Sequence, residues 1–545
     1  MGEMSFELRD RDLLGRIGRL KTKGGAVETP AFMPVVNPVS QTLPPRRMRE
    51  EFGCEIIITN SYIIKKHFGD QPDLNVHRLI DYDGVVATDS GAYQILVYGG
   101  VETSPDEIIR FQQSIGSDIA VILDIPTGWN VPREKVEWTV EETLRRAETA
   151  LPLIEGDDTL WVGPVQGGAH IDLVERSARR VGRMPFPIHA LGSPTEVMEN
   201  YRFNVLVDMI MAAKRNLPPD RPLHLFGAGH PMMFSLAVAL GCDLFDSAAY
   251  ALYAKAGRYL TTLGTMKLQD LSYLPCSCPI CRRYGADELK AMFKGERVKA
   301  LTEHNLHVTM AEMETVKQAI VEGTLWELME ARSRGHPALT TAMKGLIKYR
   351  DLLERGSPSY KGRGVFIFDS LGLARPEVTR HLRRLEEQFK PSLRRKRLIL
   401  MSAPPKRPYN KTQEYRSLER RLRDELGGDS EDIQICFYSA PFGVTPADLS
   451  ETYPLSQFEI ADPPDIETFI FTAENTASFI AEADSSDVTL ISGGGELDRW
   501  VVTRCEEVCE EMDIELKVIS SHDAWGEKAL DELISSLKSD RGDRA

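Results

Sequence analysis

The 545-residue sequence lacks any long uninterrupted apolar run. A membrane-spanning helix needs roughly 20 consecutive apolar residues, and no stretch here approaches that length. The first residues, MGEMSFELRDRDLLGR, alternate charged with apolar side chains and have no apolar core of the kind that a signal peptide carries. The sequence therefore predicts a cytoplasmic protein without a membrane segment.

An excess of positive charge is also absent. Lys and Arg number 66 against 81 Asp and Glu, which gives a formal net charge of -15. Nonspecific binding to nucleic acid depends on neutralising phosphates with Lys and Arg, so attraction over the whole surface is excluded and any contact must be local. The one candidate for such a local RNA-binding patch consists of Arg380, His381, Arg383, Arg384, Lys390, Arg394, Arg395, Lys396 and Arg397. A solvated helix face followed by a linker explains these residues equally well.

Cysteines are few, and they are unevenly placed. Three of the eight fall within the segment CSCPIC, as Cys276, Cys278 and Cys281. A cluster this tight in a cytoplasmic chain indicates a metal site rather than disulfides. The others lie in apolar or helical surroundings where an inert buried thiol is usual, and we assign no role to Cys54, Cys242, Cys436, Cys505 and Cys509.

Three thiolates need one more ligand to complete a tetrahedral zinc site. Two histidines of the segment EHNLHVT, His304 and His307, are candidates, and spacing alone does not choose between them. Three sulfurs and one nitrogen leave no open position on the metal. We therefore expect one structural zinc ion per chain rather than a metal-activated water.

The first half of the chain alternates short β-branched runs with amphipathic stretches. The expected strands are 31–36, 55–59, 84–88, 119–123, 160–165, 187–191, 222–226 and 242–245. The expected helices are 105–115, 133–154, 171–181, 194–214 and 231–240. Eight strands with interleaved helices over about 250 residues are typical of a (β/α)8 barrel.

Different patterns follow the predicted barrel. A charged insertion with the cysteine cluster covers about 253–322, and RGSPSYKGRG at 355–364 has the composition of a linker. Strand-like runs at 397–402, 432–438, 466–472, 487–492 and 514–519 alternate with helices. The predicted fold class is α/β, a (β/α)8 TIM barrel with a zinc-binding insertion, then a small α+β unit and a C-terminal three-layer α/β domain. The predicted domains are 1–354, 355–396 (linker and small basic unit) and 397–545.

The predicted barrel strands end in polar residues. Asp89 lies in TDSGAYQ, Asp124 in LDIPTG, Gln166 in VQGG and Asp246 in LFDSAAY, and HALGSP follows the sixth strand. A single Asp after a strand is more often a helix cap or turn residue. However, working groups in such barrels lie at the carboxyl ends of the strands, so five polar exits together predict one functional mouth.

Two carboxylates at one mouth offer a nucleophile and an acid/base, which double displacement at an anomeric carbon requires. A third carboxylate, together with Gln166, has the acceptors and donors to read the edge of a purine. Tyr93 has a ring able to stack on that base, although an ordinary core aromatic is the simpler interpretation. The pattern predicts glycosidic-bond chemistry without deciding which Asp is the nucleophile.

Seven motifs occur together in the order seen in one family. They are TPAFMPVV, TDSGAYQ, LDIPTG, VQGG, HALGSPTEVME, LFDSAAYALYA and CSCPIC followed by HNL. In them, residues 5–350 resemble the tRNA-guanine transglycosylase family, and specifically its archaeal branch. The resemblance implies that Asp246 is the nucleophile and Asp89 the general acid/base, both of them essential. It implies substrate binding by Ser90, Tyr93, Asp124, Gln166, Ala190 and Gly192, and zinc binding by Cys276, Cys278, Cys281 and His304.

The resemblance also implies substrates and partners. The expected reaction replaces guanine 15 of the tRNA D-loop, and HALGSP, in place of a glycine-rich version, favours 7-cyano-7-deazaguanine as the incoming base. Members of the family usually form homodimers. Many archaeal members end in a small basic RNA-binding (PUA-type) module that this sequence does not show convincingly. Either a separate polypeptide supplies it, or the basic patch and the α/β domain suffice.

The C-terminal part resembles accessory domains of archaeal members and part of archaeosine synthase. SAPPKRPYNKTQEY is similar to a Pro-Cys and Lys-Pro-Tyr motif of that paralogue, but Ala403 stands near the position of its Cys. Synthase activity is therefore not expected. The segment SGGGEL has the glycines of a phosphate loop, but no Lys-Ser/Thr follows it, so we predict a plain turn.

Three other functions compete with base exchange. A noncatalytic tRNA-binding subunit would have no need for both Asp89 and Asp246. A barrel glycoside hydrolase would share the carboxylate pair but not the zinc loop, and it would expose more aromatic platforms than the sequence indicates at this mouth. An enzyme acting on another base or RNA is the alternative that the sequence excludes least well.

Overall fold

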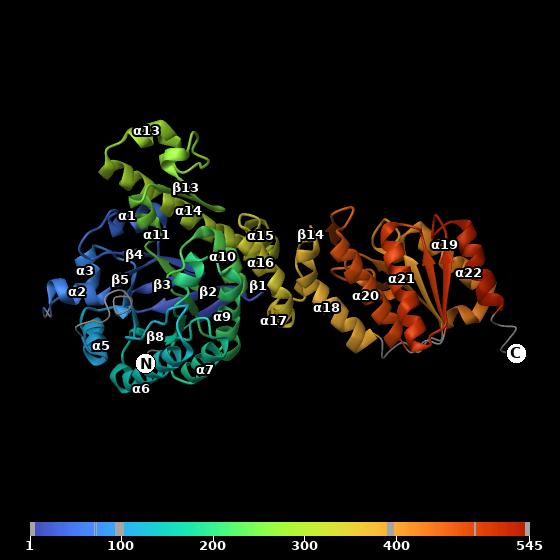
Figure 1. Cartoon of the computed structure of the whole chain (residues 1–545), viewed down its shortest axis with the longest axis horizontal. Helices are drawn as coiled ribbons and strands as arrows, with labels where there is room; N and C mark the ends of the chain where they lie inside the picture. The colour runs from blue at the N-terminus through green and yellow to red at the C-terminus, as the bar shows by residue number, and fades with distance from the viewer. Residues whose placement is uncertain are drawn as a thin grey trace. The chain divides into compact units, whose positions relative to one another are not determined.

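The computed structural model describes residues 6–69, 71, 73–92, 103–389, 397–483 and 487–539. The chain forms two compact units, Met1–Tyr349 and Arg350–Ala545 (Figure 1). Among the described residues, no helix is long and apolar enough to cross a membrane.

A closed barrel of eight parallel strands is the centre of the first unit. Its strands are β4 (Ala31–Val36), β5 (Ile56–Asn60), β6 (Val85–Asp89), β7 (Ile119–Val121), β8 (Leu160–Val165), β9 (Ile188–Leu191), β10 (Leu223–Leu225) and β11 (Leu244–Ser247). Strand β11 pairs with β4, Leu244 opposite Ala31, and closes the barrel. Small and branched side chains such as Ile58, Ala87 and Val162 fill the interior. All eight predicted strands are confirmed.

Helices surround these strands (Figure 1). They are α1 (Pro45–Phe52), α2 (Ser61–Phe68), α3 (Val76–Ile80), α5 (Pro105–Ser114), α6 (Arg133–Ile154), α7 (Ile171–Val181), α8 (Thr195–Glu199), α9 (Phe203–Asn216), η1 (Pro231–Met233), α10 (Phe234–Ala239) and α11 (Ala249–Lys255). The single helix predicted at 194–214 is wrong, because the chain breaks between α8 and α9. Tyr201 lies at the break with a φ of 55°.

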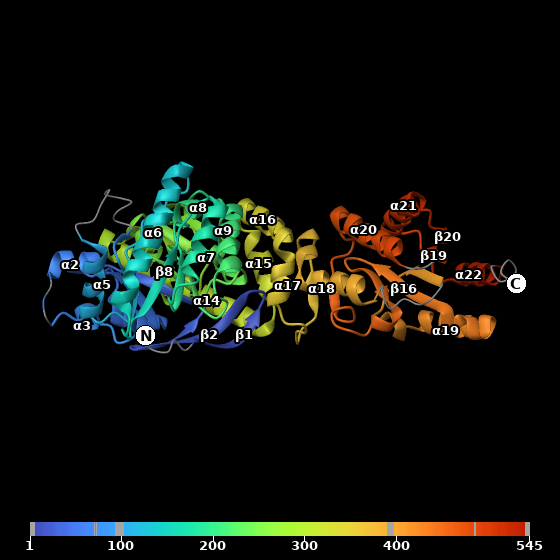
Figure 2. The ribbon, with the colours of Figure 1, turned by 90° about the horizontal axis from the view of Figure 1, so that it is seen from below.

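An antiparallel sheet at the start of the chain was not predicted. It consists of β1 (Phe6–Asp12), β2 (Gly15–Thr22) and β3 (Gly25–Thr29), and Figure 2 shows β1 and β2 along one edge of the barrel unit. Leu20 and Val27 of this sheet pack with the barrel core. The sheet therefore covers the end of the barrel at which the strands begin, with Glu7 and Arg9 exposed and Asp12 and Arg16 buried.

The insertion after α11 carries the cysteine cluster. It contains β12 (Arg258–Thr261), β13 (Gly264–Lys267), η2 (Leu268–Asp270), α12 (Pro279–Arg283), α13 (Ala286–Ala291) and α14 (Lys294–Glu322). Its own small core includes Tyr259, Leu289 and Leu301. The first unit then ends with α15 (Leu325–Ser333), α16 (Pro337–Lys344) and η3 (Gly345–Tyr349).

The second unit contains the predicted three-layer α/β domain. Its sheet has the order β17 (Gly443–Pro446), β16 (Ile433–Ser439), β15 (Arg397–Ser402), β19 (Asp487–Ser492) and β20 (Leu516–Ser520), with β17 antiparallel. One apolar core contains residues of α19 (Gln413–Leu426) and α22 (Glu527–Ser539). The other contains residues of α20 (Ile466–Glu482) and α21 (Glu496–Met512) on the opposite face. Short 3-10 turns are η7 (Tyr409–Lys411), η8 (Gly427–Asp432) and η9 (Ala447–Leu449).

The strand predicted at 466–472 is wrong, because these residues form the first half of α20. Asp465 caps this helix, and its Oδ1 accepts a hydrogen bond from the backbone N–H of Thr468 at 2.9 Å. Apolar residues recur at helical spacing over the 17 residues of α20. The prediction used only a short stretch of them, which is rich in β-branched residues and therefore resembles a strand. At SGGGEL the chain passes from β19 into the first turn of α21. The Gly494 N–H donates to Ser492 Oγ, and the Gly495 N–H donates to Asp498 Oδ2.

Within the predicted linker at 355–364, Ser357 and Lys361 are buried, whereas Tyr360 is 63% exposed. The Lys361 ammonium lies 2.9 Å from a Glu377 oxygen. The surrounding elements are α17 (Arg350–Gly356), β14 (Val365–Ile367), η4 (Ser370–Ala374), α18 (Pro376–Arg384), the π-helical turn η5 (Leu385–Phe389) and β18 (Phe458–Ile460). Strand β14 pairs with β18, so contacts join this segment to the rest of the second unit.

The described part of the predicted basic patch is not a continuous exposed surface. Arg380 and His381 are buried, and the Arg380 guanidinium lies 2.6 Å from a Glu354 oxygen. Arg397 pairs with Asp487 at 3.2 Å. These basic side chains therefore stabilise the fold of the second unit. Lys390, Arg394, Arg395 and Lys396 lie outside the described residues.

Candidate active site and metal centre

The polar strand exits meet at the carboxyl end of the barrel, a region that we call the mouth. Asp89 ends β6, Asp124 follows β7, Gln166 follows β8 and Asp246 lies near the end of β11. Because every barrel strand runs in the same direction, these ends share one face. The charges of Asp124 and Asp246 both act on Asp89, which places the three carboxylates close together.

Asp89 is held between a hydrogen-bond donor and two negative charges. Its Oδ2 accepts a hydrogen bond from Asn60 Nδ2 at 2.8 Å, and its backbone oxygen accepts one from Ser61 Oγ at 2.7 Å. Desolvation, then the charges of Asp124 and Asp246, raise the pKa of Asp89 to about 7. This side chain is therefore able to hold a proton and to release it near neutral pH.

Asp124 and Gln166 form a buried hydrogen-bonded pair. Gln166 Nε2 donates to Asp124 Oδ2 at 2.5 Å, while Gln166 Oε1 accepts from Ser193 Oγ at 2.8 Å and from the Thr127 N–H at 3.2 Å. Burial raises the pKa of Asp124 to about 6. A Cβ at Gly192 would lie 2.2 Å from Gln166 Nε2, so this glycine is needed for the amide to occupy its place.

Of the other predicted substrate-binding residues, Ser90 and Ala190 are described by the structure, and both are buried. Ser90 is buried, and its hydroxyl donates to the Ile122 carbonyl oxygen at 3.2 Å, which joins the exits of β6 and β7. Ala190 is buried within the barrel core. Tyr93 lies outside the described residues. The roles given to these three residues by the resemblance stay predictions.

Asp246 is anchored through one of its two oxygens. Its Oδ1 lies 2.8 Å from His224 Nε2 and accepts a hydrogen bond from the Gly227 N–H at 2.9 Å. Among the described residues, no hydrogen bond reaches Oδ2. The Asp246 side chain is 16% exposed and that of His224 is 3% exposed. The carboxylate is thus fixed in orientation and keeps one oxygen available at the mouth.

Sequence reasoning missed His224 and Asn60, the neighbours that hold the two candidate catalytic carboxylates. His224 lies in the strand sequence PLHLF and Asn60 at the end of ITN, where both look like ordinary strand residues. The available signal was positional. Each lies near the carboxyl end of a strand adjacent to one that ends in a candidate Asp.

The metal cluster contains the residues that the sequence analysis selected. Ligand atoms of Cys276, Cys278, Cys281 and His304 all lie within 4.8 Å of one another. His304 Nδ1 lies 3.4 Å from the sulfurs of both Cys278 and Cys281. His304 Nε2 lies 3.0 Å from the Leu260 carbonyl oxygen, which can only accept a hydrogen bond, so the proton is on Nε2 and Nδ1 is free to bind a metal. Three sulfurs and one nitrogen fit a tetrahedral site.

His307, the other candidate ligand, lies away from this cluster. Its ring is 4.3 Å from that of Phe52, measured between centroids. Asn305, next to His304, instead braces the fold. Its amide donates to the backbone oxygen of Tyr250 at 3.1 Å and accepts from the Leu260 N–H at 2.9 Å. Asn305 thereby joins the insertion to α11, the helix that follows Asp246.

Comparisons with known proteins relate most of this chain to one family. The family model described as queuine tRNA-ribosyltransferase matches residues 11–338, and a domain of unknown function matches residues 378–537. The tRNA-guanine(15) transglycosylase of Aeropyrum pernix is 46% identical over 461 residues, 83% of this chain and 87% of that protein. The Haloferax volcanii protein of the same name is 41% identical over 546 residues, 99% and 98% of the two chains. That of Methanosarcina acetivorans is 43% identical over 490 residues, 89% and 94%.

Proposed function

Because this chain belongs to the tRNA-guanine(15) transglycosylase family, we propose that it exchanges guanine 15 of the tRNA D-loop for 7-cyano-7-deazaguanine, a step in archaeosine synthesis. One observation carries the proposal. Asp89, Asp124 and Asp246 meet at the mouth, where desolvation and the other two charges raise the pKa of Asp89 to about 7. When neighbouring carboxylates have different surroundings, they lose their protons at different pH values, so one can act as an acid while another acts as a nucleophile.

The first displacement forms a covalent tRNA–enzyme intermediate. Asp246 Oδ2 attacks C1′ of the nucleotide while the bond from C1′ to N9 breaks, and the electron pair of that bond goes to N9. Asp89 gives its proton to the departing guanine. The available Oδ2 and the proton-holding Asp89 support this division of roles.

The second displacement installs the new base. Asp89 takes the proton from N9 of 7-cyano-7-deazaguanine, N9 attacks C1′, and the ester to Asp246 breaks to restore the carboxylate. Asp124 and Gln166 read the hydrogen-bonding edge of the base, with Ser90, Tyr93, Ala190 and Gly192 around them. The Asp124–Gln166 pair supports this recognition, because each has further hydrogen-bonding capacity for a purine edge.

The test is incorporation of radiolabelled guanine into unmodified tRNA. We expect exchange by the wild-type protein, suppression by unlabelled 7-cyano-7-deazaguanine, and no exchange into a matched tRNA with adenine at position 15. Binding of tRNA without exchange, by protein with its metal bound, would instead identify a noncatalytic tRNA-binding subunit.

The metal is zinc in this proposal, one structural ion per chain held by Cys276, Cys278, Cys281 and His304. When bound, it joins the cysteine loop to α14 within the insertion and supplies no reactive water. Metal analysis should find one zinc per chain. Cys281→Ser should lose it and lower the melting temperature, whereas Cys242→Ser, at a buried thiol outside the cluster, should keep it.

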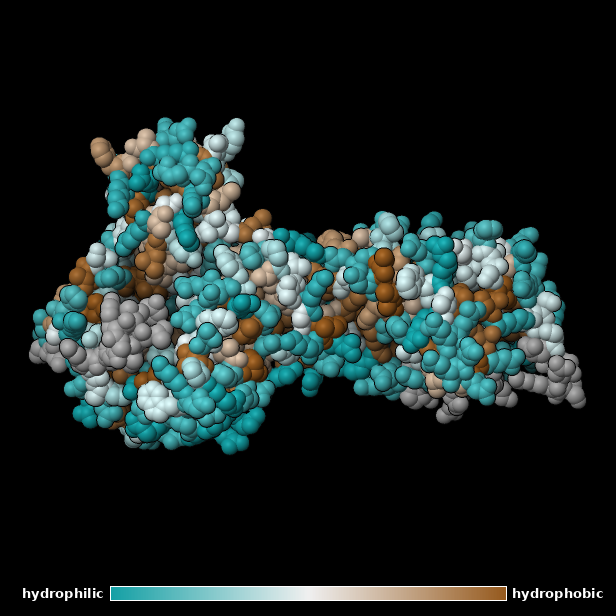
Figure 3. Space-filling view, viewed as in Figure 1, coloured by the Kyte–Doolittle hydropathy of each residue, from teal (hydrophilic) through white to brown (hydrophobic). Residues whose placement is uncertain are grey.

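Homodimerisation through the region around the metal is also part of the proposal. Exposed apolar residues support it, and Figure 3 shows apolar residues among hydrophilic ones on the insertion. The exposed apolar residues of α11 and the insertion are Leu252 (56% exposed), Leu263 (50%), Met266 (44%), Tyr273 (84%) and Phe293 (84%). Light scattering should give a dimer mass that Phe293→Asp lowers to that of a monomer. A separate PUA-type polypeptide is a further proposed partner, and the cytoplasm, where tRNA is modified, is the proposed location.

A further inference from the structure

Aromatic and arginine side chains occur together around the mouth, outside the carboxylates. We call Trp129, Tyr201, Arg202, Tyr253 and Arg258 the aromatic rim. Trp129 follows β7, Tyr201 and Arg202 follow α8, Tyr253 belongs to α11, and Arg258 begins β12. These connections leave the carboxyl ends of β7, β9 and β11, so they lie on the same face as Asp124 and Asp246.

The members of the aromatic rim touch one another in pairs. The Arg202 guanidinium carbon lies 5.7 Å from the ring centroid of Trp129, and that of Arg258 lies 5.4 Å from the ring centroid of Tyr253. Burial raises the pKa of Tyr253, against the charge of Arg258, and neighbouring Glu199 and Tyr201 add to the shift. Arg202 of the first pair directly follows Tyr201 in the chain.

Tyr201 combines exposure with backbone strain. Its φ is 55°, in the left-handed region that glycine favours, and its side chain is 49% exposed. The ring stacks on His336, with centroids 4.4 Å apart and an interplanar angle of 9°. Because the side chain is so exposed, packing in the core does not explain why a large residue occupies this position. Strained residues that neighbouring contacts hold in place are typical of ligand-binding sites.

We propose that the aromatic rim binds unpaired nucleotides of the tRNA loop that flank the exchanged guanine. One base stacks on the exposed face of Tyr201, while Arg202 and Arg258 contact phosphates. Recognition of RNA loops relies on splayed bases stacked on aromatic rings, and arginine suits phosphate. In a chain of net charge -15, paired arginines beside rings supply the local attraction that the overall charge does not. The proposal rests on the proposed function for the identity of the RNA.

Tyr201→Gly tests the aromatic rim directly. It removes the ring and also relieves the strained backbone, so the melting temperature should stay the same or rise. We expect the Kd and the KM for tRNA to rise about 10-fold, because a base loses its stacking partner, while kcat and the KM for guanine change less than about 2-fold. Tyr201→Phe should behave like the wild type. Trp138→Ala, at an exposed aromatic of α6 (58% exposed), should leave tRNA binding unchanged.

Two results would overturn the proposal. One is an unchanged Kd and KM for tRNA in Tyr201→Gly. The other is a fall in melting temperature with equal changes in kcat and both KM values, which would mean that Tyr201 supports the fold. The Kd is measured without chemistry, so a wild type that binds tRNA but does not exchange guanine contradicts the proposed function and leaves the test of the rim intact.

Discussion

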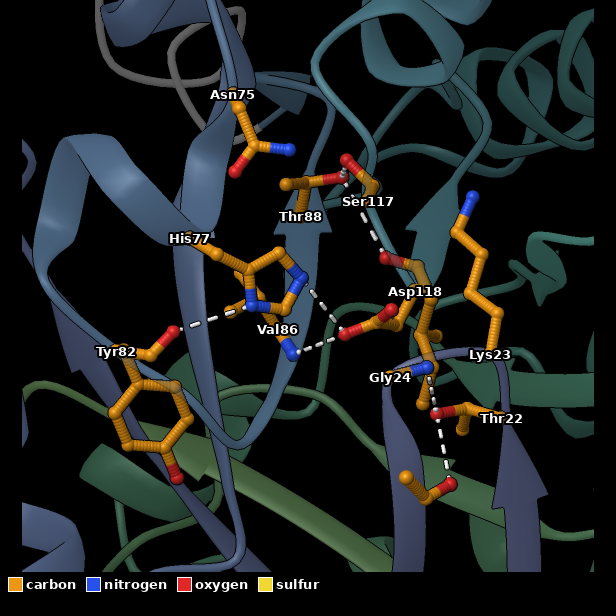
Figure 4. Close-up of polar contacts among 12 residues, drawn as sticks. Thr22, Lys23, Gly24, Asn75, His77, Tyr82, Val86, Thr88, Ser117 and Asp118 are labelled. Carbon is orange, nitrogen blue, oxygen red and sulfur yellow. Dashed lines mark hydrogen bonds and ion pairs between the residues drawn. The ribbon is translucent and has the colours of Figure 1, made fainter.

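Carboxylates occur at both ends of the barrel, but their neighbours differ. At the amino end, which we call the floor, Asp118 Oδ2 accepts a hydrogen bond from the Val86 N–H at 2.8 Å and lies 3.2 Å from His77 Nε2. Figure 4 shows the His77 ring between Asp118 and the Tyr82 carbonyl group. A Cβ at Gly24 would lie 2.3 Å from Asp118 Oδ2, so the turn between β2 and β3 closes tightly over this carboxylate.

Asp243, also at the floor, is neutralised still more completely. Its two oxygens accept hydrogen bonds from Arg16 Nε at 2.8 Å and Nη2 at 2.9 Å, and Oδ2 accepts another from the Leu223 N–H at 2.8 Å. At the mouth, by contrast, Asp89 faces two further carboxylates, and no arginine or lysine forms an ion pair there among the described residues. Charge that is paired stabilises the fold, whereas charge that is left unpaired is available for chemistry.

Asp243 and Asp246 give the sharpest form of this comparison, since only two residues separate them in the sequence. Asp246→Asn removes the proposed nucleophile but no cationic guanidinium partner. Guanine exchange should fall about 1000-fold or more, with the melting temperature within a few degrees of the wild type. Radiolabel incorporation and trapping of the covalent tRNA adduct on a denaturing gel measure the effect. Retention of the adduct would show that another residue is the nucleophile.

Asp243→Asn should have the opposite profile. It leaves the buried Arg16 guanidinium without its counter-charge, and breaking such a pair typically costs about 3–5 kcal/mol of unfolding free energy. Urea denaturation measures that loss. The fraction that remains folded should exchange guanine at close to the wild-type rate. A large loss of kcat at full stability would contradict the division between floor and mouth.

His224 tests how far the mouth depends on orientation. Replacing it with Phe removes the group that meets Asp246 Oδ1, and we expect kcat to fall about 10–100-fold with little change in the KM for tRNA. His224→Gln, which keeps a donor, should recover most of the rate. His189→Phe is the matched control, since His189 is buried in the adjacent strand β9. Equal losses in His224→Phe and His189→Phe would mean a packing effect only.

Asp89 should give stability an unusual pH dependence. Because its folded-state pKa of about 7 lies above the ordinary 3.8, the folded protein binds a proton more tightly than the unfolded chain does. Its contribution to stability is therefore fully present below about pH 4 and is lost as the pH rises through about 7. Asp89→Asn should remove this loss and be relatively more stable at pH 8 than at pH 5. Parallel curves for the two proteins in urea melts would contradict the assignment.

His77 should show the smallest effect, at the floor. Its hydrogen bond to Asp118 is the main cause that raises its pKa above 6.5, against partial desolvation. The stabilisation is fully present below pH 6.5 and is lost as the pH rises through the higher folded-state pKa. The free energy of unfolding of the wild type should exceed that of His77→Gln by roughly 1 kcal/mol at pH 6 and by less at pH 9. The difference is small because the pair is partly exposed. Guanine exchange should not change at any pH at which both proteins are folded.

Much of the fold was predictable from local patterns. The eight barrel strands, helices α6 and α7 and the cysteine cluster follow from periodicity and spacing, which depend on near neighbours in the chain. Helix α20 was misread because a β-branched stretch begins it, and the amino-terminal sheet was missed because its packing partner is the finished barrel.

The aromatic rim could not be recognised in the sequence for the same reason. Trp129, Tyr201 and Tyr253 lie far apart in the sequence and come together only because β7, β9 and β11 end on one face. The candidate basic patch around Arg380 shows the converse. Its run of positive charge is conspicuous in the sequence, but Glu354 and Asp487 neutralise part of it in the folded unit.

The sequence by itself determined the barrel, the polar strand exits and the choice of metal-binding cysteines, because these depend on periodicity and short spacings. Only the tertiary structure decided between His304 and His307 on geometric grounds, brought His224 to Asp246, and made Asp118 and Asp243 structural while Asp89 acquired a pKa of about 7. The physical reason is that a carboxylate's role depends on which charges and donors surround it, and those neighbours come from distant strands.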